Sequence, residues 1–276
     1  MLVAPSAISR QIAKLEAGVG VLLFVRHPRG MTLTDAGSRL LAHARRSEAE
    51  SAALLTELRT GGGADARHVT VARSEGFARR LVPHAMATFR HDHPDVTFHL
   101  DRVPHQEATR RVAGGIADIA VTYAMGPQHD VRVECSVAVP MAAIVPPGHP
   151  LAGRERVGPA ELCAYPLALP PTGTTQRDLF DTGVQLENLT FQPALVCDAM
   201  ATKYEFVRSG GGIALVGNLG DPAPVAEGVV YTPLDQPVFR RREAQVQTMP
   251  GRRLPWAATQ FTGLLVSLLR PAEPMS

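Results

Sequence analysis

Lysine and cysteine are scarce in this chain of 276 residues. Lys14 and Lys203 are the only lysines, so nearly all of the 28 basic residues are arginine. The three cysteines, Cys135, Cys163 and Cys197, lie far apart and form no Cys-x-x-Cys pair. Because their odd number and wide spacing do not fit a disulfide framework, we expect a reducing, cytoplasmic setting.

Several sequence signals of other protein classes are missing as well. No apolar run approaches the length of a membrane span, and residues 1–20 lack the ordered regions of a signal peptide. No Gly-x-Ser-x-Gly, His-Glu-x-x-His or phosphate-binding Gly-x-x-x-x-Gly-Lys motif occurs. The cluster His91-Asp92-His93 ends an amphipathic stretch, which favours a solvated helix end over a metal site. We therefore expect no catalytic residues, no metal and no cofactor.

The charges are divided unevenly along the chain. Seven basic residues against two acidic ones give residues 1–46 a net charge of +5, which leaves −3 for the rest of a chain whose total is +2. This asymmetry predicts a basic head that faces a polyanion, attached to a mildly acidic body.

The head is predicted to consist of a helix and a hairpin. Residues 5–17 show helical periodicity, and two short apolar strands, 21–25 and 31–34, flank a basic turn. The apolar face of this helix carries Ile8, Ile12 and Leu15.

A long helix is predicted next, over residues 35–60, with Thr34 as its N-cap. Small or apolar residues follow one another along it at alternating steps of four and three, as in a coiled-coil seam. The alternative is a helix that lies on its own domain. Because no compact core is available to it before Gly61-Gly62-Gly63, we expect it to pair with the same helix of a second copy. The predicted dimer seam consists of Leu40, Ala44, Ser47, Ser51, Leu54 and Leu58.

After a hinge at 61–66 the pattern becomes α/β, with two similar sets of strands and helices in tandem. We predict two lobes around a cleft: lobe I from 67–140 and 239–270, and lobe II from 141–238. The expected strands are 69–72, 96–103, 116–121, 137–145, 166–169, 194–197, 213–216 and two within 229–248, and the expected helices are 77–91, 106–113, one from 175, 198–208 and 256–269.

Short motifs along the whole chain resemble LysR-type transcriptional regulators. The head matches through Ala7-Ile8-Ser9-Arg10-Gln11-Ile12 and Leu33-Thr34-x-Ala36-Gly37. The body matches through His93-Pro94-Asp95-Val96, Gly115-x-x-Asp118-Ile119-Ala120-Val121, Gly148-His149-Pro150-Leu151-Ala152 and Gly210-Gly211-Gly212-Ile213-Ala214. The resemblance implies a partial winged helix-turn-helix (1–34), a linker helix (35–60) and a two-lobed, periplasmic-binding-protein-like effector domain with Rossmann-like lobes. It also implies a homodimer or homotetramer that binds double-stranded promoter DNA and responds to a small molecule.

Within this scheme the first helix is the recognition helix and the hairpin is the wing. Arginine can read guanine in a bidentate way, serine and glutamine can reach base edges or phosphate, and basic wing residues reach phosphate or the minor groove. The alternative is a solvated helix face beside an ordinary turn. The predicted DNA contacts are Ser6, Ser9, Arg10, Gln11, Arg26 and Arg29.

The effector site is expected at the carboxyl ends of strands, where helix N-termini point free N–H groups into the cleft. Hydroxyl groups beside such termini favour an anion, and we expect a carboxylate or an aromatic acid. Arg73 is a candidate partner for it, and the alternative is that strand alternation directs this side chain elsewhere. The alternative is that these residues are only helix caps. The predicted effector contacts are Ser74, Glu75, Tyr123, Thr172, Gly173, Thr174, Thr175 and Ala199.

The match begins late in the head, because only Leu2 and Val3 correspond to the helix that precedes the turn in the family. We expect a recognition helix without that support to expose Ile8, Ile12 and Leu15. An in-frame coding segment upstream would complete the regulator. The sequence otherwise leaves two alternatives: a small-molecule-binding module that has lost DNA binding, or an enzyme on the same two-lobed scaffold.

Overall fold

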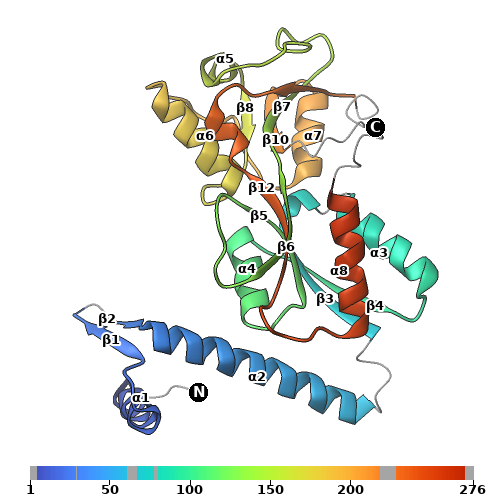
Figure 1. Cartoon of the computed structure of the whole chain (residues 1–276). Helices are drawn as coiled ribbons and strands as arrows, with labels where there is room; N and C mark the ends of the chain where they lie inside the picture. The colour runs from blue at the N-terminus through green and yellow to red at the C-terminus, as the bar shows by residue number, and fades with distance from the viewer. Residues whose placement is uncertain (1–4, 29, 61–66, 78–79, 218–227, 271–276) are drawn as a thin grey trace, which may run out of the picture.

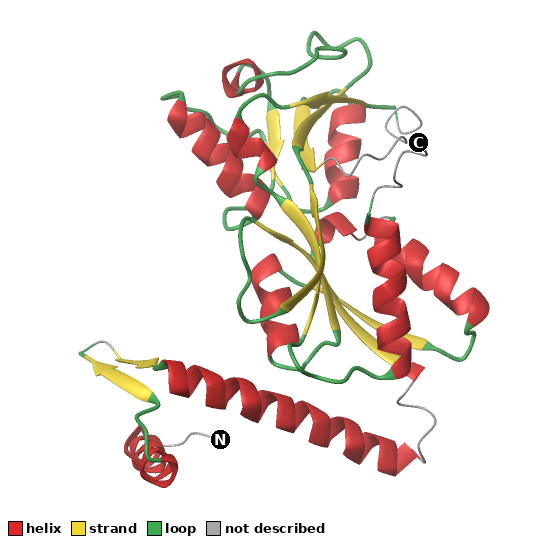
Figure 2. Cartoon of the chain, viewed as in Figure 1, coloured by secondary structure: helices red, strands yellow, loops and turns green. Residues whose placement is uncertain are grey.

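The computed structural model describes residues 5–28, 30–60, 67–77, 80–217 and 228–270 (Figure 1). The N-terminal part is a helix, a two-stranded hairpin and one long helix, and the remainder is two mixed α/β lobes stacked above it (Figure 2). None of the described helices is long and apolar enough to span a bilayer. The N-terminal elements are α1 (Pro5–Val19), β1 (Phe24–His27), β2 (Gly30–Leu33) and α2 (Asp35–Thr60).

Local hydrogen bonds hold the hairpin between the two helices. The Glu16 carboxylate accepts from the backbone N–H groups of Leu23 (2.8 Å) and Phe24 (3.1 Å). The Thr34 hydroxyl accepts from the Gly37 N–H at 3.0 Å, which confirms the predicted N-cap of α2. A Cβ on Gly37 would lie 2.0 Å from the Leu23 carbonyl oxygen, so only glycine lets α2 approach the buried Leu23 this closely.

The long helix α2 packs on lobe I with the face opposite the dimer seam. Ala49 is buried, and a Cβ on Gly115 would lie 2.6 Å from its methyl carbon. The helix therefore also contacts its own chain, because lobe I supplies a glycine at Ala49, whereas pairing with a second copy stays a prediction. Ala49 lies about 160° around the helix from Ser47 and Ser51. Of the seam residues, Ala44, Ser51, Leu54 and Leu58 are exposed, and Leu40 and Ser47 are half-buried.

Lobe I is built on a five-stranded sheet in the order β4-β3-β5-β12-β6, in which β3, β4 and β5 are parallel and β12 is antiparallel to both neighbours. Helices α3 and α8 cover one face through a common apolar core, and α4 covers the other (Figure 1). The elements are β3 (His68–Arg73), η2 (Glu75–Phe77), α3 (Leu81–Asp92), β4 (Thr97–Arg102), α4 (His105–Ala113), β5 (Ile119–Ala124), β6 (Arg132–Ala138), β12 (Glu243–Thr248) and α8 (Trp256–Leu269).

Lobe II is built on a second five-stranded sheet in the order β11-β7-β10-β8-β9. Helices α5 and α6 pack against one side and α7 against the other. Its elements are β7 (Met141–Val145), α5 (Pro159–Cys163), β8 (Leu167–Leu169), α6 (Thr175–Leu186), β9 (Leu195–Val196), α7 (Met200–Arg208), β10 (Ile213–Gly217), β11 (Val230–Pro233) and η4 (Pro237–Arg240).

The chain crosses between the lobes along two adjacent segments. The single strand predicted over 137–145 is wrong, because β6 ends at Ala138 and β7 begins at Met141 in the other sheet. Pro140 has no N–H to continue a strand ladder. The Val139 N–H donates to the Arg242 carbonyl at 2.8 Å and so joins the outgoing segment to the returning one. The predicted two-lobed α/β fold is confirmed, whereas the predicted residue limits of the lobes stay a prediction.

Candidate functional site

A cavity of about 410 Å³ lies at the carboxyl ends of strands from both lobes, within the size range of small-molecule sites. Seven of the eight predicted effector residues line it: Ser74, Glu75, Tyr123, Thr172, Gly173, Thr174 and Thr175. Ala199 is not among the lining residues, whereas its neighbours Asp198 and Met200 are.

Two of the lining hydroxyls are held by the elements that carry them. Ser74 follows β3, where its backbone N–H donates to the Val121 carbonyl and its hydroxyl shares a 2.8 Å hydrogen bond with Thr122. Thr174 is the N-cap of α6: its hydroxyl accepts from the Arg177 N–H (3.3 Å) and donates to the Pro171 carbonyl (2.9 Å). The positive end of the α6 dipole therefore faces the cavity.

Arg242 is a cavity residue that the sequence did not reveal. It is 4% exposed, its Nε donates to the Thr175 hydroxyl at 2.9 Å, and its Cζ lies 3.3 Å from the centre of the Tyr123 ring. Its Nη1 is buried, and no described residue accepts a hydrogen bond from it. Burial raises the pKa of Tyr123 and lowers the pKa of Arg242. The charge interaction and the side-chain hydrogen bond between the two residues oppose both shifts. A buried guanidinium with an unused donor is suited to bind an anion.

Lys203, on α7, is a second buried cation at the cavity. It is 1% exposed, and its Nζ donates to the Leu215 carbonyl at 3.2 Å. Burial, and then the charge of Arg242, lower the pKa of Lys203 to about 8. Its position on the buried face of a predicted amphipathic helix was the available sequence signal, because lysine is rarely fully buried without a partner.

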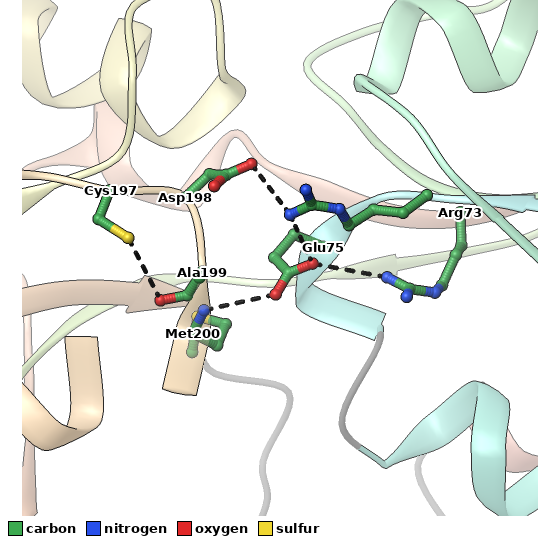
Figure 3. Close-up of polar contacts among 7 residues, drawn as sticks. Arg73, Glu75, Cys197, Asp198, Ala199 and Met200 are labelled. Atoms are coloured by element: carbon green, nitrogen blue, oxygen red, sulfur yellow. Dashed lines mark hydrogen bonds and ion pairs between the residues drawn. The ribbon is translucent and has the colours of Figure 1, made fainter. Parts of the chain in front are cut away.

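The acidic side chains at the cavity already have partners, as Figure 3 shows. Glu75 Oε2 lies 3.6 Å from Arg73 Nη1 and 3.5 Å from Arg102 Nη1, and the same Arg102 nitrogen lies 3.3 Å from Asp198 Oδ2. Glu75 Oε1 accepts from the Met200 N–H at 3.4 Å, so a carboxylate of lobe I occupies the N-terminus of α7 in lobe II. Arg73 pairs with Glu75 and is not among the lining residues, which corrects its expected role as an anion partner.

His105, at the start of α4, is another lining residue outside the predicted set. Burial lowers its pKa, Asp178 opposes this change, and Arg242 adds to it. This side of the cavity thus favours a neutral imidazole.

The predicted DNA contacts lie on α1 and the hairpin. Arg10, Gln11 and Arg26 are exposed and Ser9 is half-buried. The Ser6 side chain and Arg29 lie outside the described residues. The apolar face of α1 is open as expected, with Ile8 45% and Leu15 48% exposed and Ile12 half-buried. In the described ranges, no group of three or more His, Cys, Asp or Glu residues could hold a metal ion.

Comparison with known proteins matches two family models. Residues 62–270 match the LysR substrate binding domain, and residues 1–38 match the bacterial regulatory helix-turn-helix protein, lysR family. An uncharacterised HTH-type transcriptional regulator of Mycobacterium bovis is 30% identical over 274 residues, which cover 91% of this chain and 84% of that protein. YfeR, an uncharacterised HTH-type transcriptional regulator of Shigella flexneri, is 26% identical over 86% of this chain and 77% of its own length. Among solved structures, a C206 mutant of Corynebacterium glutamicum OxyR superposes with a TM-score of 0.60 at 19% identity, covering 96% of this chain and 84% of that one.

Proposed function

Because this chain belongs to the LysR family of transcriptional regulators, we propose that its activity at a promoter is set by a small anion bound in the cavity between its lobes. Its relatives are DNA-binding regulators with an effector-binding domain, and this is not a family of enzymes. The proposal adds the chemistry of the effector and the residues that bind it.

The observation that carries the proposal is the buried Nη1 of Arg242, which has no acceptor among the described residues. An unsatisfied buried donor on a charged group is costly, and a carboxylate in the cavity would supply the missing acceptor. The N-terminus of α6 adds further backbone donors at the cavity, which Ser74 and Thr174 also line.

A bound anion would act by holding the lobes in one relative orientation. Ser74 lies in lobe I and Thr174 in lobe II, and the two crossing segments at Val139 and Arg242 join the lobes. A ligand that contacts both lobes binds one orientation better than the other and shifts the equilibrium between them.

DNA binding is proposed to use Ser9, Arg10 and Gln11 of α1 and Arg26 of the hairpin, with Ser6 and Arg29 as further contacts. Self-association is proposed to use the dimer seam of α2, where Leu54 and Leu58 are 53% and 70% exposed. A homodimer or tetramer would then present two or more heads to promoter DNA. We place the protein in the cytoplasm, where this DNA is found.

The proposal is tested with the full chain, its own upstream DNA and a panel of organic acids. Fluorescence anisotropy measures DNA binding, and thermal shift measures binding of the acids. We expect at least one acid to stabilise the protein and to change its DNA affinity. We expect Arg242→Met to lose this stabilisation. Stabilisation by uncharged compounds alone would refute the anionic effector. Ligand binding without any DNA binding would instead support a stand-alone binding module.

A further inference from the structure

We infer that the effector carries two negative charges, because two buried cations face the cavity and neither forms an ion pair with a carboxylate of the described residues. The inference rests on the proposed function and deepens it: the ligand class narrows from an anion to a small dianion, either a dicarboxylate or a phosphate monoester. The cations are Arg242, in the crossing segment directly before β12 of lobe I, and Lys203, on α7 of lobe II.

Neither cation has a carboxylate in direct contact among the described residues. Lys203 and Arg242 are 1% and 4% exposed, and neither forms an ion pair with a carboxylate of the described residues. Lys203 donates to a backbone carbonyl, and Arg242 forms hydrogen bonds with the hydroxyl groups of Thr175 and Tyr123. Neutral acceptors solvate a buried cation but do not neutralise it. Asp198 and Glu75 attract the Lys203 charge without forming an ion pair with it, so neither cation has a counter-charge in direct contact among the described residues.

The other charges around the cavity balance one another. Arg73 and Arg102 contact Glu75, and Arg102 also contacts Asp198, which leaves two cations against two carboxylates (Figure 3). Since these four cancel, Arg242 and Lys203 are the excess charge among the lining residues and their ion-pair partners. A neutral ligand would leave both of them buried without a counter-charge, and a monoanion would leave one.

The contacts of Glu75 also limit where the acidic groups of the ligand can lie. The Glu75 carboxylate accepts from the Met200 N–H, so this backbone donor of α7 is not available to the ligand. At the N-terminus of α6, next to Thr175 and Arg242, Asp178 lies in the first turn, but no described backbone N–H donates to its carboxylate. One acidic group is therefore expected beside Arg242 and α6, and the other beside Lys203.

The positions of the two cations couple the charge of the ligand to the relative orientation of the lobes. Arg242 directly precedes β12 of lobe I, whereas Lys203 lies on α7 of lobe II. The charge of Arg242 is one cause of the lowered pKa of Lys203, so the two cations repel each other across the cavity. A dianion removes this repulsion and binds both lobes at once, which a single charge cannot do equally well.

The test compares acids with their own monomethyl esters, which keep the carbon skeleton and lose one charge. Malonate, succinate and glutarate represent dicarboxylates, and glycerol 3-phosphate with its methyl phosphodiester represents phosphate monoesters. Thermal shift and calorimetry on the full chain are expected to show at least tenfold tighter binding of the best diacid than of its ester. The series that binds identifies which of the two chemistries the site accepts.

Lys203→Met tests the assignment of the second charge, and Lys14→Met on α1 is its matched control. In Lys203→Met the tenfold preference for the diacid should disappear while binding of the ester is retained, and Lys14→Met should behave like the wild type. Equal binding of diacid and ester by the wild type overturns the inference and leaves the proposed anionic effector intact. A loss of ester binding as large as that of the diacid in Lys203→Met also overturns it. No stabilisation by any acid of the panel overturns both.

Discussion

The guanidinium carbon of Arg242 lies 3.3 Å from the centre of the Tyr123 ring, with both side chains buried at the wall of the cavity. A desolvated cation–π contact of this kind contributes about 2 kcal/mol. Together with the Nε hydrogen bond to Thr175, it holds the guanidinium in one orientation before any ligand arrives. Binding then costs little side-chain entropy, which raises affinity.

Thr174→Asp should abolish binding of the anion without unfolding α6. Aspartate is as good an N-cap as threonine, so the hydrogen bond from the Arg177 N–H is kept, but the new carboxylate repels an anion at the same helix end. We expect at least a tenfold loss of acid binding by calorimetry, with unchanged DNA affinity. Thr174→Ser is the matched control and should bind as the wild type does. Normal binding by Thr174→Asp would place the anion elsewhere.

The ligand-free protein should become more stable, relative to Lys203→Met, as the pH rises from 7 to 10. The pKa of Lys203 is lowered from 10.5 to about 8, so between these values the folded protein holds fewer protons than the unfolded chain. Stability therefore rises with pH through this window, by an amount on the order of 3 kcal/mol. The groups that act on Lys203 are Arg242, Cys197, Asp198 and Glu75. Urea unfolding of both proteins measures the difference, and a flat difference would contradict the shift.

Leu54→Glu should weaken self-association while leaving the folded chain intact. Leu54 is 53% exposed in the single chain, so the charge costs little there, but it would be buried against a second copy in a paired seam. Sedimentation equilibrium should show at least a tenfold weaker association. Arg45→Glu, exposed and outside the seam, serves as the control. Equal association of the two variants would remove α2 from the interface.

Asp118→Ala should lower the free energy of unfolding by about 3 kcal/mol, because it leaves a charge buried without a partner. Asp118 Oδ1 lies 3.1 Å from Arg252 Nη2, with the two side chains 12% and 8% exposed, and Oδ2 accepts from the Thr70 N–H. Adding Arg252→Met should recover part of the loss. Arg110→Met, in an exposed pair with Glu107, should change stability by less than about 1 kcal/mol. Denaturant titration that finds equal effects at both sites would contradict this reasoning.

Arg10→Ala should weaken promoter binding by roughly 1–3 kcal/mol and relax sequence preference, as expected for loss of a base contact. Arg10 is exposed on α1 and removing it leaves no buried group unsatisfied. Arg156→Ala, an exposed arginine of lobe II, removes the same charge far from the head and should have no effect. An anisotropy titration in which both variants match the wild type would remove Arg10 from the interface.

Much of the fold was predictable because its signals are local. Helical periodicity, the Thr34 cap and the alternation of strands and helices each depend on residues close in the chain. The predicted strand over 137–145 failed because Val139 and Pro140 form a crossing between two sheets, and an apolar run looks the same whether it stays in one sheet or changes to another.

The residues of the candidate site were likewise predictable only in part. Ser74, Thr174 and Thr175 could be predicted because they follow strands and begin helices, positions that α/β sheets use for ligands. The roles of Arg242 and Lys203 could not be predicted, because they depend on contacts with Thr175, Tyr123 and Leu215. Only the tertiary fold brings these residues to the two cations. The same holds for Glu75, whose carboxylate reaches the start of α7.

By itself, the sequence determined the order of the elements, the family of the chain and the helix ends that face the cleft, because these follow from spacing and capping along a short stretch. The tertiary structure alone decided which charges meet there. Electrostatic pairing depends on distance through space, and only the packed lobes place Glu75 at α7 while leaving Lys203 and Arg242 without a carboxylate among the described residues.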